Sequence, residues 1–182
     1  MGCDEESGLT CIDHYREVEE IPTMSFSPDA DYPLVNSEKN IYHAYYECRL
    51  SSAITIQCGE RVNVVPPLAA ADVPFEIAEV RKLADDAMKK ADFEYALSAT
   101  ESGTKIQVFG KASHSSHPEN GKNALQGLIY LLTLLPLKDE DSKIIHLLYD
   151  MFKLEYDGKS LGLIREDESG RLTLNVGVMQ WT

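Results

Sequence analysis

The stretch GKNALQGLIYLLTLL, residues 121–135, decides the fold. Its apolar side chains recur so densely that they cover nearly the whole surface of a helix; they are Leu125, Leu128, Ile129, Leu131, Leu132, Leu134 and Leu135. A helix that is apolar on most sides has to be covered on most sides. The rest of the chain must therefore supply a sheet, further helices, or both, to pack around it.

The elements on either side of this helix alternate in type. Apolar residues at helical spacing predict helices at 74–93 and 139–154. Short β-rich runs bounded by turn residues predict strands at 41–50, 53–58, 95–99, 105–110 and 172–178. The resulting order predicts an α+β fold with helices on one face of an antiparallel sheet. Its expected buried residues are Leu83, Met88, Leu128, Leu132, Leu174 and Val176.

Residues 1–38 differ in character from the rest of the chain. They are rich in Gly, Pro, Asp and Glu, and only one short stretch, 9–20, has a helical pattern. Pro28 and Pro33 predict turns, because a proline pushes the residue before it out of the helical region. This segment has too little periodic apolar surface to form a core alone. We therefore expect it to be part of something larger, and residues 39–182 to form a separate unit.

The charge and the cysteines exclude several classes of protein. The net charge is -13, with 17 Lys and Arg against 30 Asp and Glu, which argues against binding to nucleic acid or to an anionic membrane. No apolar run reaches the ~18 residues of a membrane span, and the N-terminus lacks the pattern of a signal peptide. The four cysteines contain no CxxC pair, which favours reduced thiols and a cytoplasmic location.

The first motif with chemical potential is CDEESG, residues 3–8. Adjacent carboxylates repel each other, and a cation bound by one of them relieves the repulsion. If Glu6 holds a metal, Glu5 can act as the general base that takes a proton from an activated water. The alternative is an acidic pair that is simply solvated.

The second motif is FSPDADYP, residues 26–33. Asp29 lies between two prolines that restrict the backbone, which suits a preorganised metal ligand. The alternative is an ordinary aspartate in a turn.

The third motif is GKASHSSHPENGKNA, residues 110–124. It follows a predicted strand and opens the long apolar helix. An imidazole placed there, such as His114, can donate a hydrogen bond to a developing oxyanion or bind a metal. The alternatives are a helix-capping loop, or a zinc pair made by His114 and His117, which lacks the Glu of the HExxH pattern.

The motifs DEESG, SPDADYP, ERVNVVPP and GKASHSSHPENGKNA occur in this order, and together they resemble the M20 metallopeptidases, in particular the bacterial dipeptidases of that family. The resemblance covers essentially the whole chain. It implies that Glu5 is the general base, that Glu6 is a ligand of one zinc ion, and that Asp29 is a ligand of the other. It also implies that His114 reaches over the cleft toward the substrate carbonyl oxygen and that Asn63 helps to hold a dipeptide substrate.

The resemblance also implies a fold and a domain plan. The family has a zinc-binding α/β catalytic domain that is interrupted by a ferredoxin-like lid, a domain that covers the substrate. Residues 1–38 are then expected to be part of the catalytic domain, and residues 39–182 a lid that is incomplete at its C-terminus.

The sequence departs from the family pattern at the metal site. None of the five histidines begins an HxD motif, so the upstream His and Asp and the late His of a two-zinc site are not found. Because tight zinc sites use about four ligands, we expect weak or absent zinc binding and no dipeptidase activity by this chain alone. The alternative is a non-catalytic interaction module, such as a homodimer formed through the lid.

Overall fold

The computed structural model describes residues 8, 10–25, 33, 35, 39–48 and 51–182. The chain divides into two compact units, Met1–Glu38 and Lys39–Thr182. In the first unit, helix α1 spans Thr10–Val18 and buries none of its residues. The helix predicted at 9–20 is therefore confirmed, and its lack of buried residues agrees with the shortage of periodic apolar side chains.

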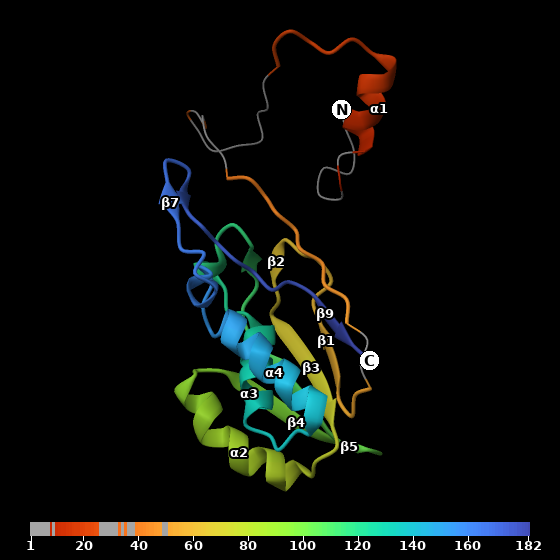
Figure 1. The fold of residues 1–182 in the computed structure, drawn as a ribbon, viewed down its shortest axis with the longest axis vertical. Helices are drawn as coiled ribbons and strands as arrows, with labels where there is room; N and C mark the ends of the chain where they lie inside the picture. The colour runs from red at the N-terminus through yellow and green to blue at the C-terminus, as the bar shows by residue number, and fades with distance from the viewer. Residues whose placement is uncertain (1–7, 9, 26–32, 34, 36–38, 49–50) are drawn as a thin grey trace. The chain divides into compact units, whose positions relative to one another are not determined.

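The second unit is built on a five-stranded antiparallel sheet with the order β4-β5-β3-β1-β9 (Figure 1). The strands are β1 Thr55–Cys58, β3 Leu68–Val73, β4 Glu94–Thr100, β5 Gly103–Phe109 and β9 Met179–Trp181. Ala71, near the centre, pairs with Ile56 on one side and Ile106 on the other, and all three side chains are buried. Side chains along β3 and β5 alternate between buried and more accessible, as expected of a sheet with one covered face.

Three helices complete the unit: α2 Ile77–Lys90, α3 Ala124–Thr133 and α4 Asp139–Phe152. Helix α3 contacts β3 and β5, α2 contacts β4 and β5, and α4 packs on α3 (Figure 1). Because α3 lies between the sheet and α4, nearly all of it is buried, which confirms the prediction from residues 121–135.

The predicted core is confirmed in part. Met88, Leu128 and Leu132 are fully buried. Leu83 is 38% exposed, so the prediction that it is buried was wrong. The buried stripe of α2 consists of Val80, Ala84 and Met88 at four-residue spacing, and it is too narrow to include Leu83.

Two predicted strands are absent from the described residues. Residues 41–48 have no regular secondary structure, and their apolar side chains are exposed; Tyr42 is 88% accessible. Residues 172–178 have no ladder partner either, and only Met179–Trp181 joins the sheet, as β9. Both stretches have the side-chain pattern of a strand, but a strand also needs a neighbour with which to form hydrogen bonds. Leu174 and Val176 are consequently half-buried.

Short elements lie outside the main sheet. Strand β2 Val64–Val65 pairs with β6 Ser113–His114, and β7 Glu166–Asp167 pairs with β8 Gly170–Arg171 across a turn at residues 168–169. The part of the chain that the structure describes also contains the 3-10 turns η2 Pro118–Asn120 and η3 Lys159–Leu161. In the described part of the chain, no helix combines the length and apolarity needed to cross a bilayer.

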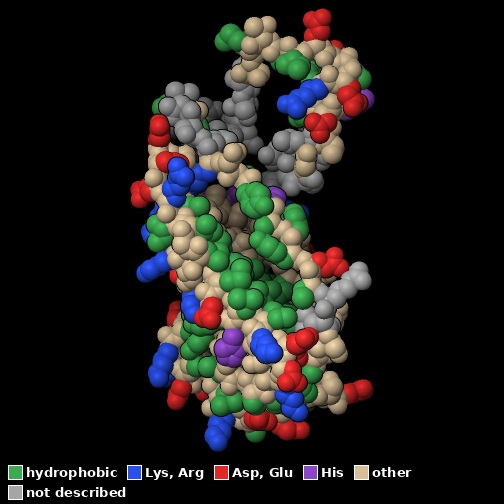
Figure 2. Space-filling view, in the orientation of Figure 1, with side chains coloured by type: hydrophobic (Ala, Val, Ile, Leu, Met, Phe, Trp, Pro, Cys, Tyr) green, Lys and Arg blue, Asp and Glu red, His purple; other side chains and the backbone are tan. Residues whose placement is uncertain are grey.

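The surface of the second unit is mixed in character. On the face shown in Figure 2, hydrophobic side chains gather over the middle of the unit, with charged side chains around them.

Candidate functional site

A two-stranded ribbon brings two of the predicted site residues together. Val64 of β2 pairs with His114 of β6, and Asn63 directly precedes β2. The backbone N–H of Ser115 donates a hydrogen bond of 2.9 Å to the carbonyl oxygen of Asn63. Asn63 and His114 are thus neighbours, although they are far apart in the sequence. The other predicted site residues, Glu5, Glu6 and Asp29, lie outside the described residues.

The hydrogen bonds of His114 select one tautomer of its exposed ring. Its Nδ1 atom accepts from the backbone N–H of Ser116 at 3.2 Å and lies 2.7 Å from the hydroxyl oxygen of the same residue. A backbone N–H can only donate, so Nδ1 of the neutral ring carries no proton. The proton is then on Nε2, which makes Nε2 a hydrogen-bond donor. This is the form of imidazole that stabilises negative charge on an oxygen.

The second histidine of the loop has a different neighbour. Nδ1 of His117 lies 3.3 Å from the Glu119 carboxylate. The pKa of Glu119 is lowered, first by a hydrogen bond from its own backbone N–H and then by His117, with burial opposing both effects. Among the described residues no group of three or more His, Cys, Asp or Glu side chains is placed to hold a metal ion. This arrangement does not support a zinc pair made by His114 and His117.

The loop that carries both histidines is closed at its base. Lys111 and Lys122 exchange backbone hydrogen bonds of 2.9 and 2.8 Å. The Ala124 N–H donates to the carbonyl of Pro66, and the Gly110 N–H donates to that of Pro67, at 2.9 and 2.8 Å. These bonds tie the ends of the ribbon to the start of α3, so the ribbon is anchored to the buried core.

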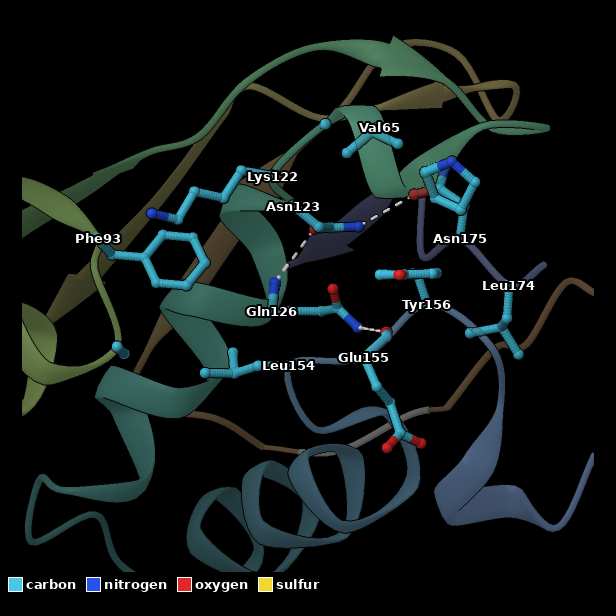
Figure 3. A pocket seen from close by; sticks show the side chains of 13 residues that line it. Val65, Phe93, Lys122, Asn123, Gln126, Leu154, Glu155, Tyr156, Leu174 and Asn175 are labelled. Atoms are coloured by element: carbon cyan, nitrogen blue, oxygen red, sulfur yellow. Dashed lines mark hydrogen bonds between the residues drawn. The ribbon is translucent and has the colours of Figure 1, made fainter. Parts of the chain in front are cut away.

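A cavity of about 210 Å³ lies beside the ribbon (Figure 3). Its lining includes Val65, Phe93, Asn123, Gln126, Tyr156 and Asn175. Gln126 is 7% exposed, and its Nε2 atom donates to the carbonyls of Phe152 and Glu155 at 3.1 and 2.6 Å. Its Oε1 atom consequently points toward the cavity (Figure 3).

One ion pair lies at the cavity wall. Nζ of Lys122 is 2.7 Å from the Asp92 carboxylate and 4.6 Å from the centroid of the Phe93 ring. The hydrogen bond and the positive charge of Lys122 lower the pKa of Asp92. Figure 3 shows the Lys122 ammonium group beside the Phe93 ring and away from the Asn123 and Gln126 side chains that also line the cavity.

Two asparagines of this region were not among the predicted site residues. Asn123 caps α3, with its Oδ1 atom accepting from the N–H groups of Leu125 and Gln126. An asparagine directly before an apolar helical run is a recognisable capping signal. Asn175 has no such signal, because it lies in the stretch that was predicted to be a strand, on the side opposite the apolar residues.

Comparison with known proteins agrees with the sequence motifs. Residues 102–180 match the family model of the M20 peptidase dimerisation domain. The chain is 35% identical over 192 residues to YtjP of Bacillus subtilis and 32% identical over 203 residues to SAR1836 of Staphylococcus aureus, both of which carry dipeptidase names. Each match covers 100% of this chain and 41% of the relative.

A third relative has a more specific name. The Beta-Ala-Xaa dipeptidase of Lactobacillus delbrueckii is 26% identical over 175 residues, covering 92% of this chain and 37% of that protein. The chain thus spans about two fifths of the length of the curated relatives it matches. The resemblance drawn from the four motifs is confirmed: residues 102–180 match the M20 peptidase dimerisation domain, and the whole chain is similar to proteins that carry dipeptidase names.

Proposed function

We propose that residues 39–182 act as the substrate-covering domain of a zinc-dependent dipeptidase, with His114 and Asn63 facing the substrate. The observation that carries the proposal is the pairing of β2 with β6, which makes these two residues neighbours on an anchored ribbon. The order β3-α2-β4-β5-α3 is compatible with a ferredoxin-like lid. The dipeptidase names of the relatives support the substrate class.

The role proposed for His114 follows from its tautomer. Attack on a peptide bond places negative charge on the carbonyl oxygen, and a donor aimed at that oxygen lowers the barrier. The Nε2–H group of His114 is such a donor, because the contacts of Nδ1 with Ser116 keep the proton on Nε2. Asn63, on the neighbouring strand, holds the substrate in place.

The remaining roles belong to carboxylates of the first unit. In this proposal Glu6 and Asp29 are the metal ligands and Glu5 is the general base. Zinc, when bound, supplies positive charge that acidifies water. The described residues hold no metal-binding group of their own, so the metal enters the proposal only through Glu6 and Asp29.

The experiment compares two histidines of one loop. Residues 1–182 replace the matching segment of a full-length relative, and His114→Ala and His117→Ala are each assayed for dipeptide hydrolysis and zinc content. We expect His114→Ala to lose roughly 10²–10³ in turnover, the value of one oxyanion donor, with its zinc content retained. His117→Ala is the matched control, because its ring contacts Glu119, and it should retain most of the activity. Loss of zinc, or equal activity of the two variants, contradicts the proposal.

A second candidate function is homodimerisation. It is favoured by the match of residues 102–180 to a domain that is named for dimerisation. Strand β4 pairs only with β5 among the described residues, so it presents a seven-residue edge to which another strand can add. Light scattering with and without zinc tests this candidate. A zinc-independent dimer that Ala99→Pro converts to a monomer supports it, and a monomer at all concentrations excludes it.

A further inference from the structure

Two side-chain amides connect the core helix α3 to the ribbon. We propose that Asn123 and Asn175 form a positioning pair that holds Asn63 and His114 at a fixed place relative to the start of α3. The functional meaning of this pair rests on the proposed function, since it assumes that the ribbon meets the substrate. The positioning itself follows from hydrogen bonds alone.

The orientation of the Asn123 amide is determined by its neighbours. Its Oδ1 atom accepts from Leu125 and Gln126 at 2.9 and 3.2 Å, so the oxygen has to face the helix. Its Nδ2 atom therefore faces away from the helix and donates to the Oδ1 atom of Asn175 and the carbonyl of Val176, both at 3.0 Å. With a side chain only 9% exposed, Asn123 uses every hydrogen-bonding position that it has.

Asn175 carries the connection onward to the ribbon. Its Oδ1 atom accepts from Asn123, which leaves Nδ2 to donate to the carbonyls of Val64 at 2.9 Å and Val62 at 3.4 Å. These are the carbonyl groups on either side of Asn63. Asn175 thus binds the backbone immediately before and immediately after Asn63, the residue proposed to contact the substrate.

The contact between Asn175 and the backbone around Asn63 also fixes the position of His114. Strand β2 pairs with β6, and Ser115 donates to the carbonyl of Asn63, so a shift of β2 moves both strands. A two-stranded ribbon is marginally stable by itself and needs contacts with the rest of the fold. The backbone of Gly177 supplies a further constraint, because a Cβ atom there would lie 2.8 Å from the carbonyl oxygen of Val62. The segment that contains Asn175 is therefore pressed closely against the ribbon.

Two isosteric substitutions separate positioning from helix capping. Asn123→Asp keeps the capping acceptor, since Asp caps a helix as well as Asn does, but it removes the donor to Asn175. Asn175 then satisfies the new carboxylate only by turning its NH₂ group away from Val64. Asn175→Asp keeps the acceptor for Asn123 and removes the donor to Val62 and Val64 directly. Asn120→Asp, an exposed residue of the same loop, is the control for the added charge.

The measurement is amide hydrogen exchange in the 182-residue chain. We expect Ser115 to exchange roughly tenfold faster in both variants, the effect of about one lost hydrogen bond. The amides of Val80 and Ile106 in the core should keep their rates, as should Ser115 in the control. The double variant Asn123→Asp/Asn175→Ala, which places no second carboxylate beside the first, should exchange no faster than Asn175→Ala, because the two asparagines act in series.

Three results would overturn the proposal that Asn123 and Asn175 position the ribbon. Unchanged Ser115 exchange in either variant would show that the ribbon does not depend on it. Equal acceleration of Val80 and Ile106 would show a general loss of stability. Multiplied effects in the double variant would show two independent roles. None of these results depends on substrate, so a failure here is distinct from a failure of His114→Ala to lose turnover.

Discussion

The Nδ1 atom of His114 lies 3.2 Å from the backbone nitrogen of Ser116, and that contact decides which ring nitrogen carries the proton. His117, three positions along the same loop, faces a carboxylate through its own Nδ1, which favours the opposite tautomer. The loop thus carries two neutral imidazoles whose protons are on different ring nitrogens. Of the two rings, His114 is the one whose contacts place the proton on Nε2.

This contrast predicts two different tautomers. In mildly alkaline buffer, long-range ¹⁵N–¹H correlation should show His114 protonated on Nε2 and His117 protonated on Nδ1. Glu119→Gln should shift the His117 equilibrium and leave His114 unchanged, because Glu119 contacts only the second ring. A His114 ring protonated on Nδ1 would contradict the geometry and remove the outward donor.

Leucines predicted alike from the sequence should differ sharply in their effect on stability. Leu132 of α3 is fully buried, whereas Leu83 of α2 is 38% exposed. Leu132→Ala should lower the free energy of unfolding by about 2–5 kcal/mol, because it leaves a cavity. Leu83→Ala should lower it by about 1 kcal/mol or less, since alanine is also the better helix former. Urea denaturation measures both, and equal losses would show that the packing around α2 is wrong.

Gly127 should resist the substitution that usually strengthens a helix. Replacing glycine by alanine within a helix normally gains about 1 kcal/mol. Here the added Cβ atom would lie 2.8 Å from two ring carbons of Phe93, so Gly127→Ala should destabilise the fold by about 1 kcal/mol net, after an overpacking cost of about 2 kcal/mol. Combining it with Phe93→Leu should recover part of the loss. A simple gain in thermal stability would show that the ring moves freely.

The Asp92–Lys122 pair should be visible in an acid titration. Because Lys122 lowers the pKa of Asp92, the carboxyl midpoint should fall below its ordinary value of 3.8. A depressed carboxyl pKa contributes stability above the unfolded-state pKa, and this contribution is lost as the pH falls through the folded-state pKa. Lys122→Met, or added salt, should bring the midpoint back toward the ordinary value. The Asp92 side-chain signal in NMR reports it, and a midpoint indifferent to both changes would show that the ion pair is absent in solution.

The cysteines should differ in reactivity. Burial raises the pKa of the Cys58 thiol to about 12, and its side chain is 2% exposed, whereas Cys48 is exposed. Because the thiolate is the reactive form, iodoacetamide should label Cys48 in the native chain and Cys58 only after unfolding. Peptide mass mapping distinguishes the two sites. Labelling of Cys58 in the native chain would mean that the pairing of β1 with β3 opens in solution.

The sequence by itself determined the elements whose pattern is local. The hairpin β4–β5 and helices α2, α3 and α4 lie where residue spacing and turn chemistry predict them, because those signals depend on neighbours along the chain. The motifs around Asn63 and His114 likewise indicated the M20 relationship that the comparisons confirm.

The tertiary structure decided everything that depends on a distant partner. Residues 41–48 and 172–178 have the side-chain pattern of strands, but a ladder exists only where another backbone offers its hydrogen bonds, so neither stretch became one. The same physics makes Asn63 and His114 neighbours and gives Asn175 its hold on the ribbon. A polar contact across the fold leaves no period in the sequence, because its two halves are brought together only when the core packs.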